Sequence, residues 1–310
     1  MISVIIPLYN AFGYLEPLLN GLAGQTTPHE LILIDSSSTD GTPEWLHERR
    51  IPFHSIPTAA FNHGSTRNLG VSLAKSDYVV MLTQDALPNG SDCLEKLIKV
   101  LQSDPNIALV YGRQLPYPDA TPLSQFARQT NYPAGNQHKT KADIDRLGIR
   151  TCHCSNSFAA YRKSALLSVG GFPYDVILGE DVVVAAQFIL AGLAIAYYGD
   201  AEVVHSHNYT IGEEFRRYFD IGTFHQQRFT LLQPFLRAES EGFRYVQNEW
   251  RFLRQQHRLD LIPNQMVRTI AKYAGYRMGR VQDQLPNWLK PRMSMHQSFW
   301  LTTKTAELDH

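Results

Sequence analysis

The strongest constraint on the fold is a regular alternation, up to residue 111, between short apolar runs and segments with helical spacing. The apolar runs predict four strands, over Ser3–Ile6, Leu31–Asp35, Tyr78–Leu82 and Ala108–Tyr111. Apolar spacing between them predicts helices, over Tyr14–Leu22, Pro43–Arg49, Thr66–Ala74 and Leu94–Leu101. Strands that alternate with helices form βαβ units, so we expect an α/β fold with a mainly parallel sheet between two helical layers.

The alternation fades between Arg113 and Arg150, where polar residues and prolines predict long loops with one short helix. Regular spacing then predicts strands and helices in turn, over Ser157–Tyr161, Lys163–Val169, Asp181–Ala191 and Ala194–Tyr198. The sheet is expected to end at Tyr198. The stretch from Val182 to Tyr198 is apolar, but Gly192 splits it as a helix C-cap and acidic residues flank it, which argues against a membrane span.

The chain beyond Thr210 is predicted to be helical, and its charge differs from that of the rest. Between Arg244 and Lys304, eleven Lys or Arg stand against three acidic residues, beside several aromatic side chains. We therefore predict a sheet domain over residues 1–210 and a basic helical region over residues 211–310. Docking on a membrane surface or dimerisation would explain this region, and so would plain packing with solvated charges.

Composition excludes several classes of protein. The 29 Lys and Arg balance the 29 Asp and Glu, so the molecule as a whole is not an electrostatic binder of nucleic acid. Three cysteines do not form a closed disulfide framework and suit a reducing compartment. No secretory signal precedes the first predicted strand, so a cytoplasmic location is expected.

Polar segments follow the first two predicted strands. Pro7-Leu8-Tyr9-Asn10 follows the first, and the segment from Asp35 to Thr42 follows the second and leads into a helix. Ligands of open parallel sheets bind at the carboxyl ends of the strands, so both segments lie where a nucleotide would bind. The alternative is that the second segment only caps its helix. No Gly-x-Gly-x-x-Gly follows the first strand, which argues against a dinucleotide oxidoreductase.

Arg67 and Asp85 are candidates for contact with phosphate groups. Arg67 falls in the first turn of a predicted helix, where it could face phosphate oxygens or simply lie on the surface. Asp85 follows the strand Tyr78–Leu82, and one carboxylate can hold Mg²⁺ when the phosphates and waters of a substrate complete the shell. The alternative for Asp85 is an ordinary turn residue.

Two further clusters carry ionisable groups. Glu180 and Asp181 open an apolar helix, whose dipole stabilises them, and an ionised carboxylate there could act as a general base toward a hydroxyl group. His205 and His207 follow a strand-like run, and their alternation directs both imidazoles to one face. Metal ligands and core histidines are both compatible with this pattern.

Together these segments resemble a known family, the family 2 glycosyltransferases of the GT-A fold, which use a nucleotide-activated sugar. The residues from Ser3 to Asn10 resemble the opening strand of the family, and those from Ile34 to Thr42 resemble its V-D-D-G-S-T-D-G-T segment. Arg67-Asn68-Leu69-Gly70 is similar to R-N-x-G, and Gly179-Glu180-Asp181 is similar to G-E-D. The resemblance runs from Ser3 to about His225.

Within the family, the chain most resembles bacterial rhamnosyltransferases that use dTDP-β-L-rhamnose. The segments that carry this resemblance are Ile34–Thr42, Phe61–Asn68, Thr83–Ala86, His205–Tyr209, Tyr276–Arg280 and Leu285-Pro286. Two positions depart from the family pattern: Ser36 replaces a second Asp that reads the pyrimidine, and Thr83 replaces the first residue of Asp-x-Asp.

The resemblance implies an inverting enzyme that moves L-rhamnose from dTDP-L-rhamnose to a hydroxyl of a saccharide or lipid-linked oligosaccharide, with an α-linkage, in O-antigen-type polysaccharide assembly. It implies a divalent cation, Mg or Mn, and Asp181 as the catalytic base. The implied residues for nucleotide-sugar binding are Pro7, Tyr9, Asp35, Ser37, Arg67, Gln84 and Asp85. Those for the sugar and acceptor are Tyr132, Asn156 and Glu180, and those for the metal are Asp85, His205 and His207.

Other interpretations stay open at this stage. A family 2 enzyme could use another dTDP- or UDP-sugar, since selectivity for a pyranose depends on a few hydroxyl contacts. A non-catalytic nucleotide-sugar binder is the alternative from another class. Peripheral contact with the inner face of the cell membrane and a homodimer are further expectations.

Overall fold

The computed structural model describes residues 1–236 and 240–301. The chain forms two compact units. The first unit comprises residues 1–118, 128–174 and 180–206, and the second comprises residues 119–127, 175–179 and the described residues from 207 onward.

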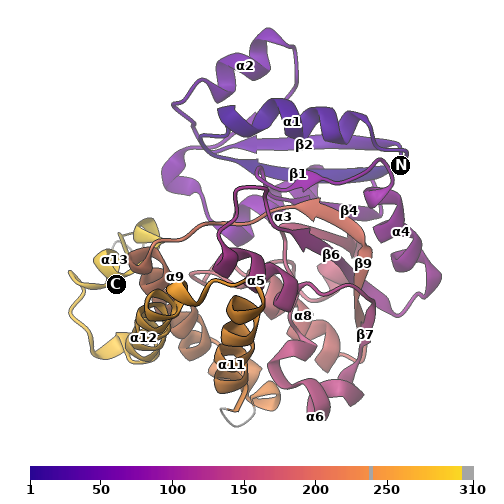
Figure 1. Ribbon diagram of the computed structural model, residues 1–310. Helices are drawn as coiled ribbons and strands as arrows, with labels where there is room; N and C mark the ends of the chain where they lie inside the picture. The colour runs from indigo at the N-terminus through magenta and orange to yellow at the C-terminus, as the bar shows by residue number, and fades with distance from the viewer. Residues whose placement is uncertain (237–239, 302–310) are drawn as a thin grey trace, which may run out of the picture. The chain divides into compact units, whose positions relative to one another are not determined.

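The first unit is built on a mixed sheet, which Figure 1 shows with its flanking helices. Among the described residues its nine strands follow the order β3-β2-β1-β4-β8-β6-β9-β5, and β7 also pairs with β9. The strands are β1 Ile2–Leu8, β2 His29–Asp35, β3 His54–Ser55, β4 Tyr78–Leu82, β5 Leu87–Pro88, β6 Ile107–Leu115, β7 Gln137–Lys139, β8 Phe158–Arg162 and β9 Ala194–Val204.

Strand β8 makes the sheet mixed rather than mainly parallel. β1 pairs in parallel with β2 and β4, β2 with β3, and β6 with β9. β8 lies antiparallel between β4 and β6, with its first residue, Phe158, opposite Leu82 at the end of β4. The chain thus enters β8 from the carboxyl ends of its neighbours. The loop before β8 is therefore placed at the edge of the sheet where ligands of such folds bind.

Helices cover both faces of the sheet. They are α1 Phe12–Ala23, α2 Thr42–Glu48, α3 His63–Leu73, α4 Cys93–Ser103, α6 Ile144–Leu147, α7 Lys163–Ser168 and α8 Glu180–Leu190. The side chains of β1 alternate between the faces, and Val4 and Ile6 join the core cluster that α1 and α4 complete. Ile5 points the other way, toward α3, where a Cβ on Gly70 would lie 2.3 Å from it. The α/β architecture is confirmed.

The structure corrects two expectations about the sheet. Strand β9 does not end at Tyr198 but continues to Val204, and β6 extends to Leu115 beside it. The register shifts between Gly112 and Arg113, where the partner changes from Tyr198 to Glu202. Gly199 and Asp200, both poor strand formers, lie in β9 at this irregularity. The sequence pattern therefore does not predict the part of the strand that follows them.

The segment between Arg113 and Arg150 holds more regular structure than long loops with one short helix. It contains the helix α5 Pro122–Asn131, the strand β7, the short helix α6 and two turns of 3₁₀ helix. Strand β7 covers the outer side of β9 from Gln137 to Lys139. A three-residue strand is too short to produce a period that the sequence can reveal.

The regular structure of the second unit is helical over its described residues, which confirms a helical C-terminal region. Its helices from 207 onward are α9 Ile211–Gln227, α10 Phe229–Leu232, α11 Ser240–Gln255, α12 Ile262–Arg280 and α13 Lys290–Met293. α9 and α12 approach closely through glycines: a Cβ on Gly279 would lie 2.0 Å from the carbonyl oxygen of Phe219. None of the described helices is long and apolar enough to cross a membrane.

Candidate active site

Two loops meet at the carboxyl ends of β1 and β2, where Leu8 lies opposite Asp35 in parallel register. The backbone N–H of Asn10 donates to Ser38 Oγ at 2.8 Å, and the N–H of Thr39 donates to Asn10 Oδ1 at 3.0 Å. Asn10 and Ser37 have φ angles of 50° and 58°, which non-glycine residues adopt at an energetic cost. The hydrogen bonds between the loops stabilise this conformation and keep the polar edge of the sheet in one shape.

The residues predicted to bind the nucleotide gather at this edge. Gln84, just beyond β4, exchanges two hydrogen bonds with the backbone of Tyr9, at 2.8 and 3.0 Å. The Tyr9 side chain is half exposed, whereas Asp35 is buried and accepts hydrogen bonds from the backbone N–H and hydroxyl of Ser38. Ser37 is exposed and its hydroxyl donates to the carbonyl of Ile56 at 2.8 Å, while Pro7 is partly buried.

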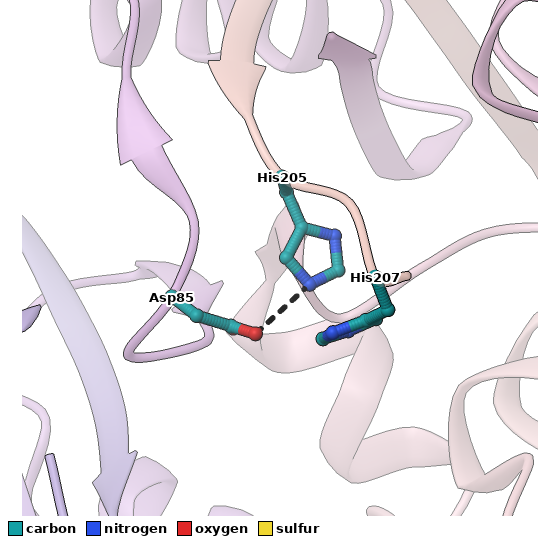
Figure 2. Close-up of side chains that lie close together, drawn as sticks. All are labelled: Asp85, His205 and His207. Carbon is teal, nitrogen blue, oxygen red and sulfur yellow. Dashed lines mark ion pairs between the residues drawn. The ribbon is translucent and has the colours of Figure 1, made fainter. Parts of the chain in front are cut away.

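An Asp–His–His cluster lies at the ends of β4 and β9 (Figure 2). Asp85 follows β4, His205 is the first residue after β9, and His207 lies two residues further along the chain. One ligand atom from each of the three lies within 4.8 Å of the others. His205 Nε2 lies 3.4 Å from Asp85 Oδ2. The structure therefore brings together the three residues that the sequence predicts as metal ligands.

The hydrogen bond on the other side of His205 assigns its tautomer. Nδ1 lies 2.9 Å from the side-chain oxygen of Gln114, and Arg128 donates to the same oxygen. A carbonyl oxygen can only accept, so Nδ1 carries a proton, and Nε2 is the ring atom that faces the Asp85 carboxylate and is able to present a lone pair to a metal ion. A carboxylate oxygen and an imidazole nitrogen that face one another can both coordinate a cation. The donor set therefore fits a divalent metal ion, whose histidine ligands usually donate their other N–H to such a partner.

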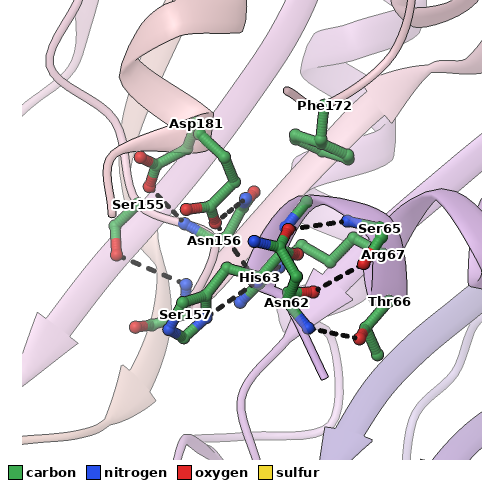
Figure 3. A network of polar contacts seen from close by, with 12 residues as sticks. Asn62, His63, Ser65, Thr66, Arg67, Ser155, Asn156, Ser157, Phe172 and Asp181 are labelled. Carbon is green, nitrogen blue, oxygen red and sulfur yellow. Dashed lines mark hydrogen bonds and ion pairs between the residues drawn. The ribbon is translucent and has the colours of Figure 1, made fainter. Parts of the chain in front are cut away.

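Asp181 lies in the first turn of α8, where Figure 3 shows it beside Asn156. Its Oδ2 accepts the backbone N–H of Asn156 at 3.1 Å, and its Oδ1 accepts the N–H of Val182 at 2.8 Å. Burial and the adjacent Glu180 carboxylate raise the pKa of Asp181 to about 6. The side chain is partly exposed. A carboxylate that is ionised at neutral pH but still basic can accept a proton from a hydroxyl group.

Glu180 is the buried partner of this pair. Its Oε1 lies 3.2 Å from Arg67 Nη1 and accepts a hydrogen bond from Asn156 Nδ2 at 3.0 Å. Burial raises the pKa of Glu180, but Arg67, His63 and the Asn156 amide outweigh burial and hold that pKa below its usual range. Arg67 also donates to the carbonyl of His63 at 2.9 Å. The structure thus makes Arg67 the counter-ion of Glu180, and its contact with a diphosphate stays a prediction.

Tyr132 is also near this centre but is buried. Its ring packs beside His153 and Tyr197, and its hydroxyl forms a hydrogen bond with Ser155. Contact of Tyr132 with a sugar stays a prediction.

Sequence reasoning missed Gln114, His63 and Tyr161 at these centres. Gln114 lies in the part of β6 beyond Tyr111, which the sequence does not predict as strand. Tyr161 lies in an apolar strand, where a tyrosine is expected to contribute only the packing of its ring. His63 could have been predicted as a site residue because it lies four residues before Arg67, in the segment that leads into the predicted helix.

Solved structures share this fold at low sequence identity. One is the mannosyltransferase PcManGT from Pyrobaculum calidifontis in complex with GDP-Man and Mn2+, with a TM-score of 0.63 at 19% identity, covering 92% of this chain and 88% of that one. Another is S. aureus TarS 1-349 in complex with UDP-GlcNAc, with a TM-score of 0.54 at 17% identity, covering 100% of this chain and 92% of that one. These likenesses confirm an α/β fold of the GT-A type.

Sequence comparison is more specific than the fold. Residues 3–170 match the model of Glycosyl transferase family 2, and the chain belongs to this family. It is 44% identical to the O-antigen chain rhamnosyltransferase RfbN of Salmonella typhimurium over 96% of each chain. It is 43% identical to the O-antigen chain rhamnosyltransferase WbaN of Salmonella anatum, over 96% of this chain and 95% of the relative. The chain is therefore a glycosyltransferase.

The buried ion pair predicts a charge-dependent loss of stability. We expect Arg67→Met to lower the free energy of unfolding by about 3–5 kcal/mol, because it leaves Glu180 buried without its cation. The double variant Arg67→Met/Glu180→Gln should recover much of that loss, because neither side chain is then charged. Urea denaturation monitored by circular dichroism measures both.

The same pair predicts a pH dependence. The low pKa of Glu180 stabilises the wild type above the usual glutamate pKa, and this contribution is lost as the pH falls through the folded-state value. The deficit of Arg67→Met should therefore shrink in acid, where Glu180 is protonated in both proteins. Equal destabilisation of the single and double variants at every pH would contradict the assignment of Arg67 as counter-ion.

Proposed function

We propose that this chain is an inverting rhamnosyltransferase that transfers L-rhamnose from dTDP-β-L-rhamnose to a hydroxyl of a saccharide acceptor during assembly of an O-antigen-type polysaccharide. The observation that carries the proposal is the 44% identity to an O-antigen chain rhamnosyltransferase over 96% of both chains. Likeness over the whole length includes the helical C-terminal region as well as the sheet. A lipid-linked oligosaccharide is the acceptor that we propose.

In this proposal Asp181 is the catalytic base. It is the partly exposed member of the carboxylate pair, and two backbone N–H groups orient it. Its ionised form accepts the proton of the acceptor hydroxyl while that oxygen attacks the anomeric carbon. The bond to the leaving dTDP breaks on the opposite face of the sugar, and the bonding electrons leave with the diphosphate. One displacement inverts the carbon, so a β-linked donor yields an α-rhamnoside.

The loops at the ends of β1, β2 and β4 are the proposed donor site. The half-exposed Tyr9 ring, Pro7 and Ser37 offer surfaces to the thymidine, and Asp35 retains lone pairs beyond those that Ser38 uses. Gln84 fixes the backbone of Tyr9. Arg67 is proposed to act on the diphosphate through its positive charge.

The loop before β8 and the start of α8 are the proposed sugar and acceptor site. Tyr132, Asn156 and Glu180 are buried close to Asp181, and we propose that they support this region. The hydrogen bond between Asn156 and Glu180, and that between Tyr132 and Ser155, support a role in shaping the site that surrounds the base.

Asp85, His205 and His207 are proposed to hold a divalent cation. When bound, such a cation would offset the charge of the leaving diphosphate. Two imidazoles in the donor set favour a transition metal over Mg²⁺, which prefers oxygen ligands. We therefore propose Mn²⁺ as the better of the two cations.

A donor panel tests the proposed function. With purified protein and a rhamnose-accepting lipid-linked saccharide, we expect release of dTDP from dTDP-β-L-rhamnose that depends on the acceptor. UDP-glucose, UDP-GlcNAc and dTDP-glucose serve as competing donors. Faster turnover of another donor would establish a different sugar specificity, and donor binding without turnover of any donor would favour a non-catalytic binder.

Replacement of the base gives a second prediction. Asp181→Asn should reduce kcat by ~10²- to 10⁴-fold with donor affinity nearly unchanged, because the amide keeps the shape and removes the basic site. In the wild type, kcat/KM should fall below about pH 6, where Asp181 becomes protonated. The matched control is Asp145→Asn, an exposed carboxylate on α6, which should retain wild-type kinetics. More than half of the wild-type turnover in Asp181→Asn would rule out this base.

Metal dependence gives a third prediction. Chelation should abolish transfer, and Mn²⁺ should restore it at lower concentration than Mg²⁺. Loss of the free Mn²⁺ signal in electron paramagnetic resonance should report binding that Asp85→Ala and His205→Ala weaken. His138→Ala, an exposed histidine on β7, should bind as the wild type does. Full activity of the chelated protein, or unchanged Mn²⁺ binding by Asp85→Ala, would contradict the cation site.

We also propose that the second unit contacts an anionic membrane surface. Met266, Val267, Ile270 and Tyr273 form an exposed apolar stripe on α12, on the side away from the glycines that approach α9. Exposed arginines accompany this stripe in the same unit, at 251 and 254 on α11 and at 258 beyond it. Anionic lipid attracts each such cation by ~1 kcal/mol, and apolar side chains can enter the headgroup region.

Liposome co-sedimentation tests this contact. We expect binding to vesicles with anionic lipid but not to purely zwitterionic ones, weakened by salt and by the triple change of Arg251, Arg254 and Arg258 to Gln. A matched control changes three exposed arginines of the first unit, Arg49, Arg50 and Arg146, to Gln. No preference for anionic vesicles at low salt would overturn the proposal, and a dimer in light scattering would then assign the stripe to a second copy.

A further inference from the structure

Tyr161 is a fully buried tyrosine whose hydroxyl has a specific polar partner. It lies on β8 in the apolar run Phe158–Arg162, where a phenylalanine would fill the same space. Its ring meets that of Phe172 edge to face, with centroids 5.3 Å apart. Its hydroxyl donates to Asn156 Oδ1 at 2.7 Å. Since a buried hydroxyl needs a partner, this contact fixes both residues.

The Glu180 carboxylate selects the orientation of the Asn156 amide, and the Tyr161 hydroxyl holds the amide in that orientation. With Oδ1 turned to the Tyr161 hydroxyl, Nδ2 faces Glu180 Oε1 at 3.0 Å. The opposite orientation would set the amide oxygen against a carboxylate, and two acceptors would then face one another. The same residue donates its backbone N–H to Asp181 Oδ2 at 3.1 Å. Asn156 therefore links the Tyr161 hydroxyl to both carboxylates at the start of α8.

We propose that Tyr161 is a positioning residue for the transfer reaction: its hydroxyl fixes the side chain of Asn156, and the backbone N–H of that residue holds the Asp181 carboxylate in place. The inference rests on the proposed function, because it concerns the base of that reaction. Tyr161 does not touch the reacting atoms. It acts only through Asn156.

The direction of the effect follows from the groups that face the carboxylate pair. These groups come from α3, β8, the segment before β8 and the residue after α5, and they are His63, Arg67, Tyr161, Cys152, Cys154 and Tyr132. Arg67 and His63 favour the ionised form of Glu180, with Arg67 the larger influence. Burial and Glu180 raise the pKa of Asp181. The backbone N–H of Asn156 lowers this pKa because its hydrogen bond stabilises the ionised form. Loosening Asn156 would therefore let the pair bind protons at higher pH.

Tyr161→Phe tests this inference in the full-length protein with the dTDP-rhamnose assay. We expect kcat near neutral pH to fall about five- to tenfold, the effect of losing one hydrogen bond. The KM for the donor should stay the same, and the acidic limb of the kcat/KM profile should move to higher pH. The matched control is Tyr197→Phe, another buried tyrosine, whose hydroxyl donates to the carbonyl of Pro133 at 2.7 Å. This control should keep the wild-type pH profile.

A double-mutant cycle tests the route through Asn156. If the Tyr161 hydroxyl acts only through the side chain of Asn156, its removal has no further effect once that side chain is gone. Tyr161→Phe/Asn156→Ala should therefore match Asn156→Ala. If Tyr161→Phe does not fold, the upward shift of the acidic limb in Asn156→Ala alone still tests the proposal. Melting temperatures of all variants report their folding.

Several results would overturn the inference. They are a wild-type kcat and pH profile in Tyr161→Phe, a loss of activity that leaves the acidic limb in place, additive effects in the cycle, or an unmoved limb in Asn156→Ala. These are distinguishable from failure of the proposed function, which Asp181→Asn reports. If Asp181→Asn is inactive while Tyr161→Phe equals the wild type, Asp181 remains the proposed base and only the positioning role of Tyr161 is rejected.

Discussion

The buried ion pair between Arg67 and Glu180 is the interaction on which the rest of the candidate active site depends. Two charges with side chains less than a tenth exposed are tolerable only when they compensate each other and most of their remaining hydrogen-bonding groups have partners. The His63 carbonyl accepts from Arg67 Nη1 and the Asn156 amide donates to Glu180, while Arg67 Nε is buried without a hydrogen-bond partner among the described residues. Because Asp181 directly follows Glu180, the pair also fixes the start of α8 and the place of the proposed base.

The segment from Ser155 to Ser157 connects the two chemical centres of the sheet unit. Ser155 accepts a hydrogen bond from the Gln114 amide, whose oxygen sets the tautomer of His205, and Asn156 binds Asp181. The segment has this place because β8 runs antiparallel to its neighbours and begins at their carboxyl ends. One strand in the reverse direction therefore brings a loop from the middle of the chain between the Asp–His–His cluster and the carboxylate pair.

Much of the fold was predictable, because β1, β2, β4 and the helices between them follow simple hydrophobic periods. The direction of β8, the continuation of β9 past Gly199 and the short β7 were not, since each depends on tertiary pairing that leaves no period. The ionisable residues of the candidate site were found because they end strands or begin helices. Tyr161 and Gln114 were missed because a strand residue with one buried polar contact has the same pattern as ordinary core.

The most direct test of the proposed single displacement at Asp181 is the anomeric configuration of the product. Nuclear magnetic resonance of the rhamnoside formed from dTDP-β-L-rhamnose gives this configuration from the one-bond coupling between C1 and H1. A hydroxyl that attacks once, opposite the leaving diphosphate, gives an α-rhamnoside as the sole product. A β-rhamnoside would require two displacements through an enzyme nucleophile and would contradict the role of Asp181 as a base.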